Sequence, residues 1–179
     1  MTHLRGEIDI IADIDYSGAV PVPSFLHLRS FGAVPRPTGH VPTVYLAGPI
    51  DYQTKEEATR WRNEAKKLLK ANCLDPTEGL GGLQWTGDGA QDAKVVERDR
   101  RMVAEADVLL VKFKPAIPFI GTSMEIAFAH TWGKPVVMFT EGVAFKQVSP
   151  FLLYHVEATF MWLEQAAEYI NTEYGPKVN

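Results

Sequence analysis

The sequence predicts an α/β protein, with a three-layer domain whose parallel sheet of about five strands is flanked by helices, and an N-terminal β arm. From residue 43 on, short apolar runs alternate with stretches of helical periodicity, which implies right-handed crossovers and parallel strands. Five of the 12 prolines precede residue 43, which sets the first 42 residues apart. The 179 residues are 46% hydrophobic and 22% charged, ordinary values for a chain that buries one core.

The first 42 residues are expected to form a β arm that ends in a proline-rich linker. Two candidate strands, 7–14 and 24–30, carry apolar residues in strand-like patterns, and residues 34–40 have the composition of a linker. Two strands alone do not make a stable domain. We therefore expect the arm to pack on the domain of residues 43–179 or on a neighbouring subunit, in a homodimer or larger homo-oligomer.

The first half of the domain is expected to run strand, helix, strand and loop. Val44–Ala47 is a short apolar run that a Gly-Pro turn closes. Over 54–71, alanine, tryptophan and leucine recur at helical spacing between charged residues. Cys73-Leu74 is a brief strand, and a loop with five glycines follows over 77–91.

The second half continues the alternation. A helix over 92–106 precedes 108–113, the clearest buried strand in the sequence. A helix over 122–132, a strand over 135–139 and a last helix over about 159–172 complete the order. This organisation is of the flavodoxin-like or Rossmann-like kind.

The expected binding cleft lies beyond the carboxyl ends of the strands, where parallel sheets bind their ligands. Three segments follow strand ends, namely 48–53, 75–88 and 114–122. We expect these three segments to share one cleft.

Composition excludes several classes of protein. Eighteen Lys and Arg against 22 Asp and Glu give a net charge of −4, which disfavours a nucleic-acid partner. The single cysteine, Cys73, forms neither an internal disulfide nor a cysteine zinc site, which fits a reducing, cytoplasmic setting. The N-terminus lacks the apolar run of a signal peptide, and no apolar stretch approaches the roughly 20 residues that span a bilayer.

No cofactor and no metal are expected. The five histidines are scattered, with no pair at metal-ligand spacing. The sequence has neither a G-x-G-x-x-G fingerprint nor a Walker motif, so cradles for dinucleotides or triphosphates lack support.

Glu125 has two interpretations that its spacing leaves open. Thr122 and Glu125 have the spacing of a capping box, in which the glutamate reaches back to the N-cap backbone. Alternatively, a glutamate in the first helical turn beyond a strand end feels the positive end of the helix dipole. That position would keep it ionised and aim it into the cleft, as a carboxylate nucleophile requires.

Asp99 interrupts the apolar stripe of the helix over 92–106. It stands four residues from Val95 and three from Met102, on the same face of the helix. An acid on a buried stripe is costly unless it is paired or faces a polar cavity. It is therefore either a buried partner for a backbone N–H or an arginine, or a functional group in the cleft, and we favour the second interpretation.

Four further residues have one structural and one functional interpretation each. Tyr45 could point its hydroxyl into the cleft or belong to the core. Asp51 follows the first turn and could cap the next helix. Asp75 is a candidate ligand contact at a strand end, although Asp-Pro is also a common turn. Trp85 could stack on a base or hold its glycine-rich loop.

Four motifs together resemble the nucleoside 2-deoxyribosyltransferase family, which includes the 2'-deoxynucleoside 5'-phosphate N-hydrolases. They are VYLAGPI at 44–50, ADVLLV at 106–111, GTSMEIAFA at 121–129 and GKPVV at 133–137. The similarity spans about residues 43–140. The first and third motifs, at this separation and order, are fairly specific.

The resemblance implies an N-glycosidic bond cleaved in two steps. It makes Glu125 the nucleophile that attacks the anomeric carbon, Tyr45 the residue that positions it, and Asp99 the group that assists departure of the base. The deoxyribosyl-enzyme ester is then resolved by a second base or by water, as in retaining glycosidases. The implied partners are a nucleoside or nucleotide and a free nucleobase. The residues expected to contact the substrate are Gly48, Pro49, Asp75, Phe119, Gly121, Thr122 and Ser123.

The sequence departs from the family pattern at Phe119. Many relatives have a polar or acidic residue six positions before the glutamate, where it contacts the 5' group of the sugar. Phenylalanine there leaves open whether the substrate is a nucleoside or a 5'-monophosphate. The arm over 1–40 and the loop over 77–91 have no counterpart in the family.

Three functions are compatible with these residues. The first is transfer of deoxyribose between nucleobases, with hydrolysis of (deoxy)nucleoside 5'-monophosphates as its closest variant. The second is a non-catalytic nucleotide-binding module, in which Glu125 only caps a helix. The third is a phosphoribohydrolase of the cytokinin-activating type, but the Pro-Gly-Gly stretch of that family is missing before Gly121. Tyr45, Asp99 and Glu125 together favour an enzyme.

Overall fold

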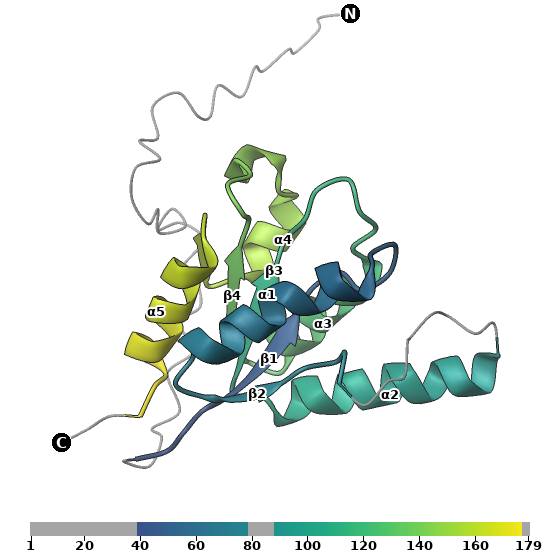
Figure 1. The fold of residues 1–179 in the computed structure, drawn as a ribbon, viewed down its shortest axis with the longest axis horizontal. Helices are drawn as coiled ribbons and strands as arrows, with labels where there is room; N and C mark the ends of the chain where they lie inside the picture. Colours follow the sequence, from purple (N-terminus) through teal and green to yellow (C-terminus); the bar gives the residue numbers. More distant parts are fainter. Residues whose placement is uncertain (1–38, 79–87, 177–179) are drawn as a thin grey trace, which may run out of the picture.

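The computed structural model describes residues 39–78 and 88–176, and it confirms the three-layer α/β architecture (Figure 1). The elements follow one another as β1 (Thr43–Ala47), α1 (Lys55–Leu68), β2 (Asn72–Leu74), α2 (Gly89–Glu105), β3 (Val108–Lys112), α3 (Ile120–Thr131), β4 (Val136–Phe139), a 3₁₀ turn (Phe145–Gln147), α4 (Pro150–His155), β5 (Ala158–Phe160) and α5 (Leu163–Glu173).

The sheet has five parallel strands in the order β2-β1-β3-β4-β5. β1, β3 and β4 form its centre, and every residue of β3 and β4 is buried. The strand order reverses between β1 and β3, because β1 pairs with β2 on one side and with β3 on the other. Such a reversal opens a crevice at the carboxyl ends of the strands.

Helices cover both faces of the sheet and bury two apolar cores. On one face, Val44 and Leu46 pack with Trp61 of α1 and Ile170 of α5 (Figure 1). On the other face, the alternate residues of β1 and β3 pack with α2, α3 and α4. Because successive side chains of a strand point to opposite faces, Tyr45 lies on the α2–α3 side of the sheet.

The prediction for the last helix was wrong at its start. Residues 158–160 form the edge strand β5, and α5 begins only at Leu163. A strand of three buried residues is too short to show the alternation by which strands are recognised in a sequence. The short helix α4 was also not predicted; Ser149 caps it and Pro150 occupies its first position, as is typical of helix starts.

Three predictions fall on residues that the structure does not describe. The candidate strands 7–14 and 24–30 lie outside the described residues, as does the glycine-rich segment 79–87 with Trp85. Within the described ranges, no helix has the length and apolar character needed to cross a bilayer.

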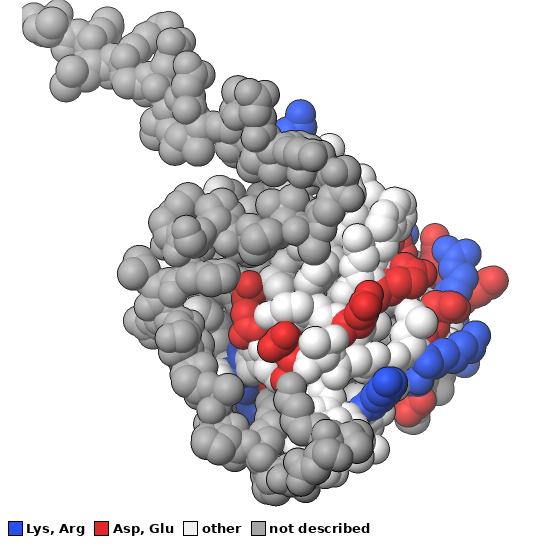
Figure 2. Space-filling view, turned by 90° about the vertical axis from the view of Figure 1, so that its left-hand side faces the viewer, with Lys and Arg blue, Asp and Glu red and all other residues white. Residues whose placement is uncertain are grey.

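The charges on one end of the molecule agree with the acidic composition. α5 carries Glu164, Glu168 and Glu173 and no Lys or Arg. On the face in Figure 2, Asp and Glu are spread over the described surface, whereas Lys and Arg gather towards its margins. The described part of this face therefore offers no broad basic surface of the kind that duplex nucleic acid requires.

Candidate active site

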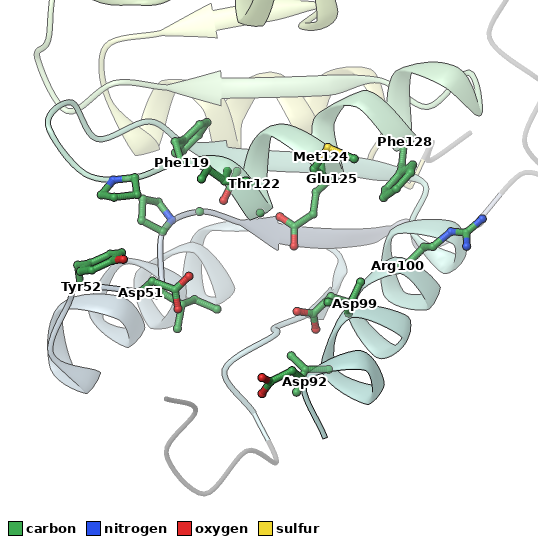
Figure 3. A pocket seen from close by; sticks show the side chains of 18 residues that line it. Asp51, Tyr52, Asp92, Asp99, Arg100, Phe119, Thr122, Met124, Glu125 and Phe128 are labelled. Carbon is green, nitrogen blue, oxygen red and sulfur yellow. The ribbon is translucent and has the colours of Figure 1, made fainter. Parts of the chain in front are cut away.

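A cavity of about 500 Å³ opens at the carboxyl end of the sheet (Figure 3). Its walls are the turn after β1 (48–52), the face of α2 over 92–100, and the segment 118–128 that leads into α3. Two of the three segments that were predicted to share a cleft therefore do so. The third wall comes from α2, since the described residues of the 75–88 segment do not line the cavity.

Glu125 is held in this cavity by Tyr45. The Tyr45 hydroxyl donates a hydrogen bond of 2.6 Å to Glu125 Oε1, and the tyrosine itself is completely buried between the sheet and the helices. The hydrogen bond fixes the carboxylate in one orientation, with its other oxygen left for the cavity (Figure 3).

The capping-box interpretation of Glu125 is wrong. α3 begins at Ile120, its N-cap is Phe119, and no side chain caps it. Thr122 is therefore already inside the helix, and Glu125 lies in the second turn. The dipole argument weakens for the same reason, because the effect falls off within the first turn.

Burial, more than any other influence, sets the ionisation of Glu125. Burial and, to a smaller extent, the nearby carboxylate of Asp99 raise the pKa, and the net value is about 7. The hydrogen bond from Tyr45 and the positive charge of Arg62 act in the opposite direction. Glu125 is therefore about half ionised near neutral pH, in contrast to the fully ionised carboxylate that the helix dipole predicted.

Asp99 faces the same cavity from α2 (Figure 3). Arg98 donates two hydrogen bonds to its Oδ1, from Nε at 3.1 Å and from Nη2 at 2.8 Å. Nη2 also donates to the carbonyl of Pro76. Burial raises the pKa of Asp99, although Arg98 opposes this. Asp99 thus combines both interpretations: it is paired with an arginine and it lines the cavity.

The apolar stripe around Asp99 is cavity wall in its first half and core in its second half. Val103 is the only residue of α2 that is buried, whereas Val95 and Val96 line the cavity and Val96 is 52% exposed. An amphipathic pattern shows which face of a helix is apolar, but not whether that face meets the core or a cavity.

The predicted substrate contacts divide into two groups. Five of them line the cavity: Gly48, Pro49, Phe119, Gly121 and Thr122. Asp75 and Ser123 do not. The Ser123 hydroxyl donates to the Phe119 carbonyl at 2.7 Å, and Asp75 is 4% exposed and bound by Lys66 and Thr77.

Gly48 is required where β1 enters the cavity wall. A Cβ at this position would lie 2.9 Å from Cζ2 of Trp61 and 3.2 Å from Cβ of Lys112. Only glycine allows the strand end to pass this close to α1 and β3.

The cavity lining is rich in carboxylates. Asp51, Asp92, Asp99 and Glu125 line it, against one guanidinium, that of Arg100. Arg100 lies over the ring of Phe128 at 5.4 Å and over that of Trp132 at 5.8 Å. Within residues 39–78 and 88–176, no three His, Cys, Asp or Glu side chains gather to hold a metal ion.

The sequence analysis did not identify Arg62, which is fully buried behind the cavity at the end of β1. Its position carried the same signal as that of Asp99: it stands four residues after Ala58 and three before Ala65, on the buried face of α1.

Replacing Glu125 with Gln should stabilise the protein at alkaline pH. The folded-state pKa lies above the ordinary glutamate value of 4.5, so the penalty for burying the charge is absent below pH 4.5 and grows as pH rises through about 7. Gln retains the size of the side chain and a partner for Tyr45. With a discount for the partial exposure of Glu125 to the cavity, E125Q should gain about 1–3 kcal/mol at about pH 9 and little at about pH 5. Urea denaturation measures both, and an equal difference at the two pH values would contradict the buried-charge account.

Comparisons with known proteins agree with this geometry. The family model for nucleoside 2-deoxyribosyltransferase matches residues 44–166. A sequence comparison with curated proteins finds no significant match.

Two solved structures are similar to this chain, and the first of them has the same fold. The 2-deoxyribosyltransferase of Bacillus psychrosaccharolyticus superposes with a TM-score of 0.60 at 19% identity, over 71% of this chain and 91% of that one. The CMP N-glycosidase of Clostridium botulinum has a TM-score of 0.45 at 15% identity, over 73% of this chain and 95% of that one. Because the family match covers more than half of the sequence, including β1, α2 and α3 around the cavity, the chain belongs to the nucleoside 2-deoxyribosyltransferase family of enzymes.

Proposed function

We propose that the protein cleaves the N-glycosidic bond of 2'-deoxynucleosides through a deoxyribosyl ester on Glu125 and transfers the sugar to another nucleobase. The observation that carries this proposal is the Glu125 carboxylate, oriented by Tyr45 at 2.6 Å and facing Asp99 across one cavity. A binding module does not need this arrangement, because a neutral sugar can be bound through uncharged groups without the cost of burying an ionisable carboxylate beside a second one.

In the first step, an oxygen of Glu125 forms a bond to C1' of the sugar while the bond from C1' to the base nitrogen breaks. The electron pair leaves on the base, and Asp99 donates a proton or a hydrogen bond to it. Burial raises the pKa of Asp99, which is the direction that proton donation to the leaving base requires.

In the second step, the nitrogen of an incoming base attacks C1' and loses its proton to Asp99. The ester bond breaks and the Glu125 carboxylate is regenerated. Water in the position of the incoming base would give hydrolysis, so the acceptor decides between transfer and hydrolysis.

The charge of the cavity favours nucleosides over nucleotides. A 5'-phosphate brings nearly two negative charges, and the described lining holds four carboxylates against the one guanidinium of Arg100. Phe119 adds an apolar ring to this lining, packed edge-on against Phe113 with ring centroids 5.6 Å apart. A free 5'-hydroxyl fits these surroundings better than a phosphate does.

Single substitutions should separate the roles of the three side chains. We expect Glu125→Ala to abolish base release in a folded protein, and Asp99→Asn to slow it by about 10²–10⁴-fold, as is typical of lost acid–base assistance. Tyr45→Phe should have a milder effect. The effect should be largest at acidic pH, because the hydrogen bond from Tyr45 lowers the pKa of Glu125 and its removal leaves less of the ionised form. Glu97→Gln, on the exposed part of α2, is the matched control.

The measurement is chromatography of reactions with each deoxynucleoside and each deoxynucleoside monophosphate, with and without a free base. We expect new nucleosides only when a free base is present. Full activity of Glu125→Ala would refute the covalent mechanism, and preferential turnover of the monophosphates would identify a nucleotide hydrolase instead.

We also propose that the protein is a homodimer, through the face formed by α3 and α4. These two helices pack together and carry large exposed apolar side chains, with Ile120 77% and Phe151 82% exposed. Monomers rarely leave such side chains grouped on one surface.

Light scattering should give a dimer mass for the wild type and a monomer mass for Phe151→Asp. Val41→Asp is the control, because Val41 is exposed but precedes β1. A monomeric wild type at micromolar concentration would contradict the dimer.

A further inference from the structure

Arg62 is the largest fully buried side chain among the described residues, and each of its three guanidinium nitrogens donates a hydrogen bond. Nε donates to the Leu46 carbonyl at 3.1 Å and Nη2 to the Gly48 carbonyl at 2.8 Å, at the carboxyl end of β1. Nη1 donates to the Ala58 carbonyl of its own helix at 2.5 Å. An arginine remains charged in proteins, so a positive charge sits permanently behind this strand end.

Asp75 is the ion partner of Arg62, at 3.6 Å between Oδ1 and Nε. The same carboxylate also binds Lys66 at 2.6 Å. Burial raises the pKa of Asp75, but the hydrogen bonds from Lys66 and Thr77 outweigh it and lower the value. Asp75 therefore stays ionised and joins the end of β2 to the end of β1, which explains why it lies outside the cavity.

The carbonyls that Arg62 holds lie next to the catalytic groups. Leu46 follows Tyr45, whose hydroxyl binds Glu125, and Gly48 lines the cavity. The guanidinium thus clamps the backbone on both sides of the point where β1 leaves the sheet. A shift of this strand end would displace Tyr45, and with it the orientation of Glu125.

We propose that Arg62 is a positioning residue of the reaction: its buried guanidinium holds the Leu46 and Gly48 carbonyls and so fixes the end of β1, from which Tyr45 orients Glu125. This inference rests on the proposed function for its role in turnover. The hydrogen bonds of the guanidinium and its ion pair with Asp75 are independent of that function.

The positive charge of Arg62 also favours the ionised form of Glu125, as the smallest of four influences on its pKa. Tyr45 on β1 and Asp99 on α2 face it directly, and Asp51 and Asp92 line the same cavity. Two carboxylates that share a site oppose each other's ionisation.

The other two arginines near the cavity contact groups other than Glu125. Arg98 chelates Asp99, and Arg100 lies over the rings of Phe128 and Trp132. Among the described residues, Arg62 is the cation that lowers the pKa values of Glu125 and Tyr45.

Three substitutions separate the charge from the hydrogen bonds. Arg62→Gln removes the charge. Arg62→Lys keeps the charge, but a single ammonium cannot donate to the Leu46 and Gly48 carbonyls in the fork geometry of a guanidinium. Asp75→Asn is the matched control, because it removes the ion partner and leaves the guanidinium in place.

The ionisation of Glu125 is read without turnover, by carbon-13 NMR titration of protein labelled at the glutamate δ-carbon and assigned with E125Q. The midpoint should rise by about one unit in Arg62→Gln, as expected for the loss of a nearby opposite charge. It should stay at the wild-type value in Arg62→Lys and should not rise in Asp75→Asn. An unchanged midpoint in Arg62→Gln, or an equal rise in Asp75→Asn, would overturn the electrostatic role.

The positioning role is read from kcat. In Arg62→Lys, kcat should fall by about 10–100-fold at a pH above the midpoint, the range expected for a small misplacement of reacting groups. A wild-type kcat in Arg62→Lys would overturn the positioning role.

If circular dichroism shows that Arg62→Gln does not fold, Arg62→Lys decides both parts, since a raised midpoint in that variant would refute the role of the charge. If the wild type releases no base, the proposed function fails while the NMR titration still tests Arg62.

Discussion

The hydrogen bond from Tyr45 to Glu125 joins residues 80 positions apart, and the rest of the site depends on it. It requires β1 to lie beside β3 at the centre of the sheet, because β3 leads into the helix that carries Glu125. It also requires Gly48, which lets the strand end pass close to Trp61 and Lys112. The parallel order of the strands brings these groups to one edge of the sheet, where a cavity of about 500 Å³ gives access to them.

Holding a carboxylate in this position lowers the stability of the folded state. Burial raises the pKa of Glu125 to about 7 and also raises that of Asp99. Because a raised carboxylate pKa means that the charged form is disfavoured in the fold, stability decreases as the pH rises through the folded-state value. Active sites commonly hold such unfavourable groups in exchange for reactivity, and the positive charge of Arg62 behind β1 reduces the cost of ionising Glu125.

Much of this architecture could be predicted from the sequence, because the central elements have strong local patterns. The apolar runs of β1, β3 and β4 and the helical periodicity around Trp61 are all visible in single segments. The edge strand β5 could not be recognised in this way, because three residues are too few to show the alternation of a strand. The predicted start of α3 was two residues late, because threonine is a preferred N-cap residue and phenylalanine, the actual N-cap at Phe119, is not.

Which residues form the candidate site could largely be predicted from the sequence, but the ionisation of their side chains could not. An acid on an apolar stripe identified Asp99, and the same reasoning applies to Arg62, whose guanidinium is buried on α1. The ionisation of Glu125 depends on distances to Tyr45, Asp99 and Arg62 across three different elements, and such distances exist only in the folded chain. The role of Asp75 likewise depends on Lys66 and Arg62, which local sequence does not place beside it.

The covalent step on Glu125 is the central claim, and trapping the intermediate tests it most directly. A 2'-fluorinated nucleoside slows both steps, because fluorine destabilises the developing positive charge at C1', so the ester should accumulate. Intact-mass spectrometry followed by peptide mapping should then locate one fluorodeoxyribosyl group on Glu125 in the wild type and none in Glu125→Gln. Turnover of natural nucleosides with no adduct on Glu125, or an adduct on another residue, would contradict the account.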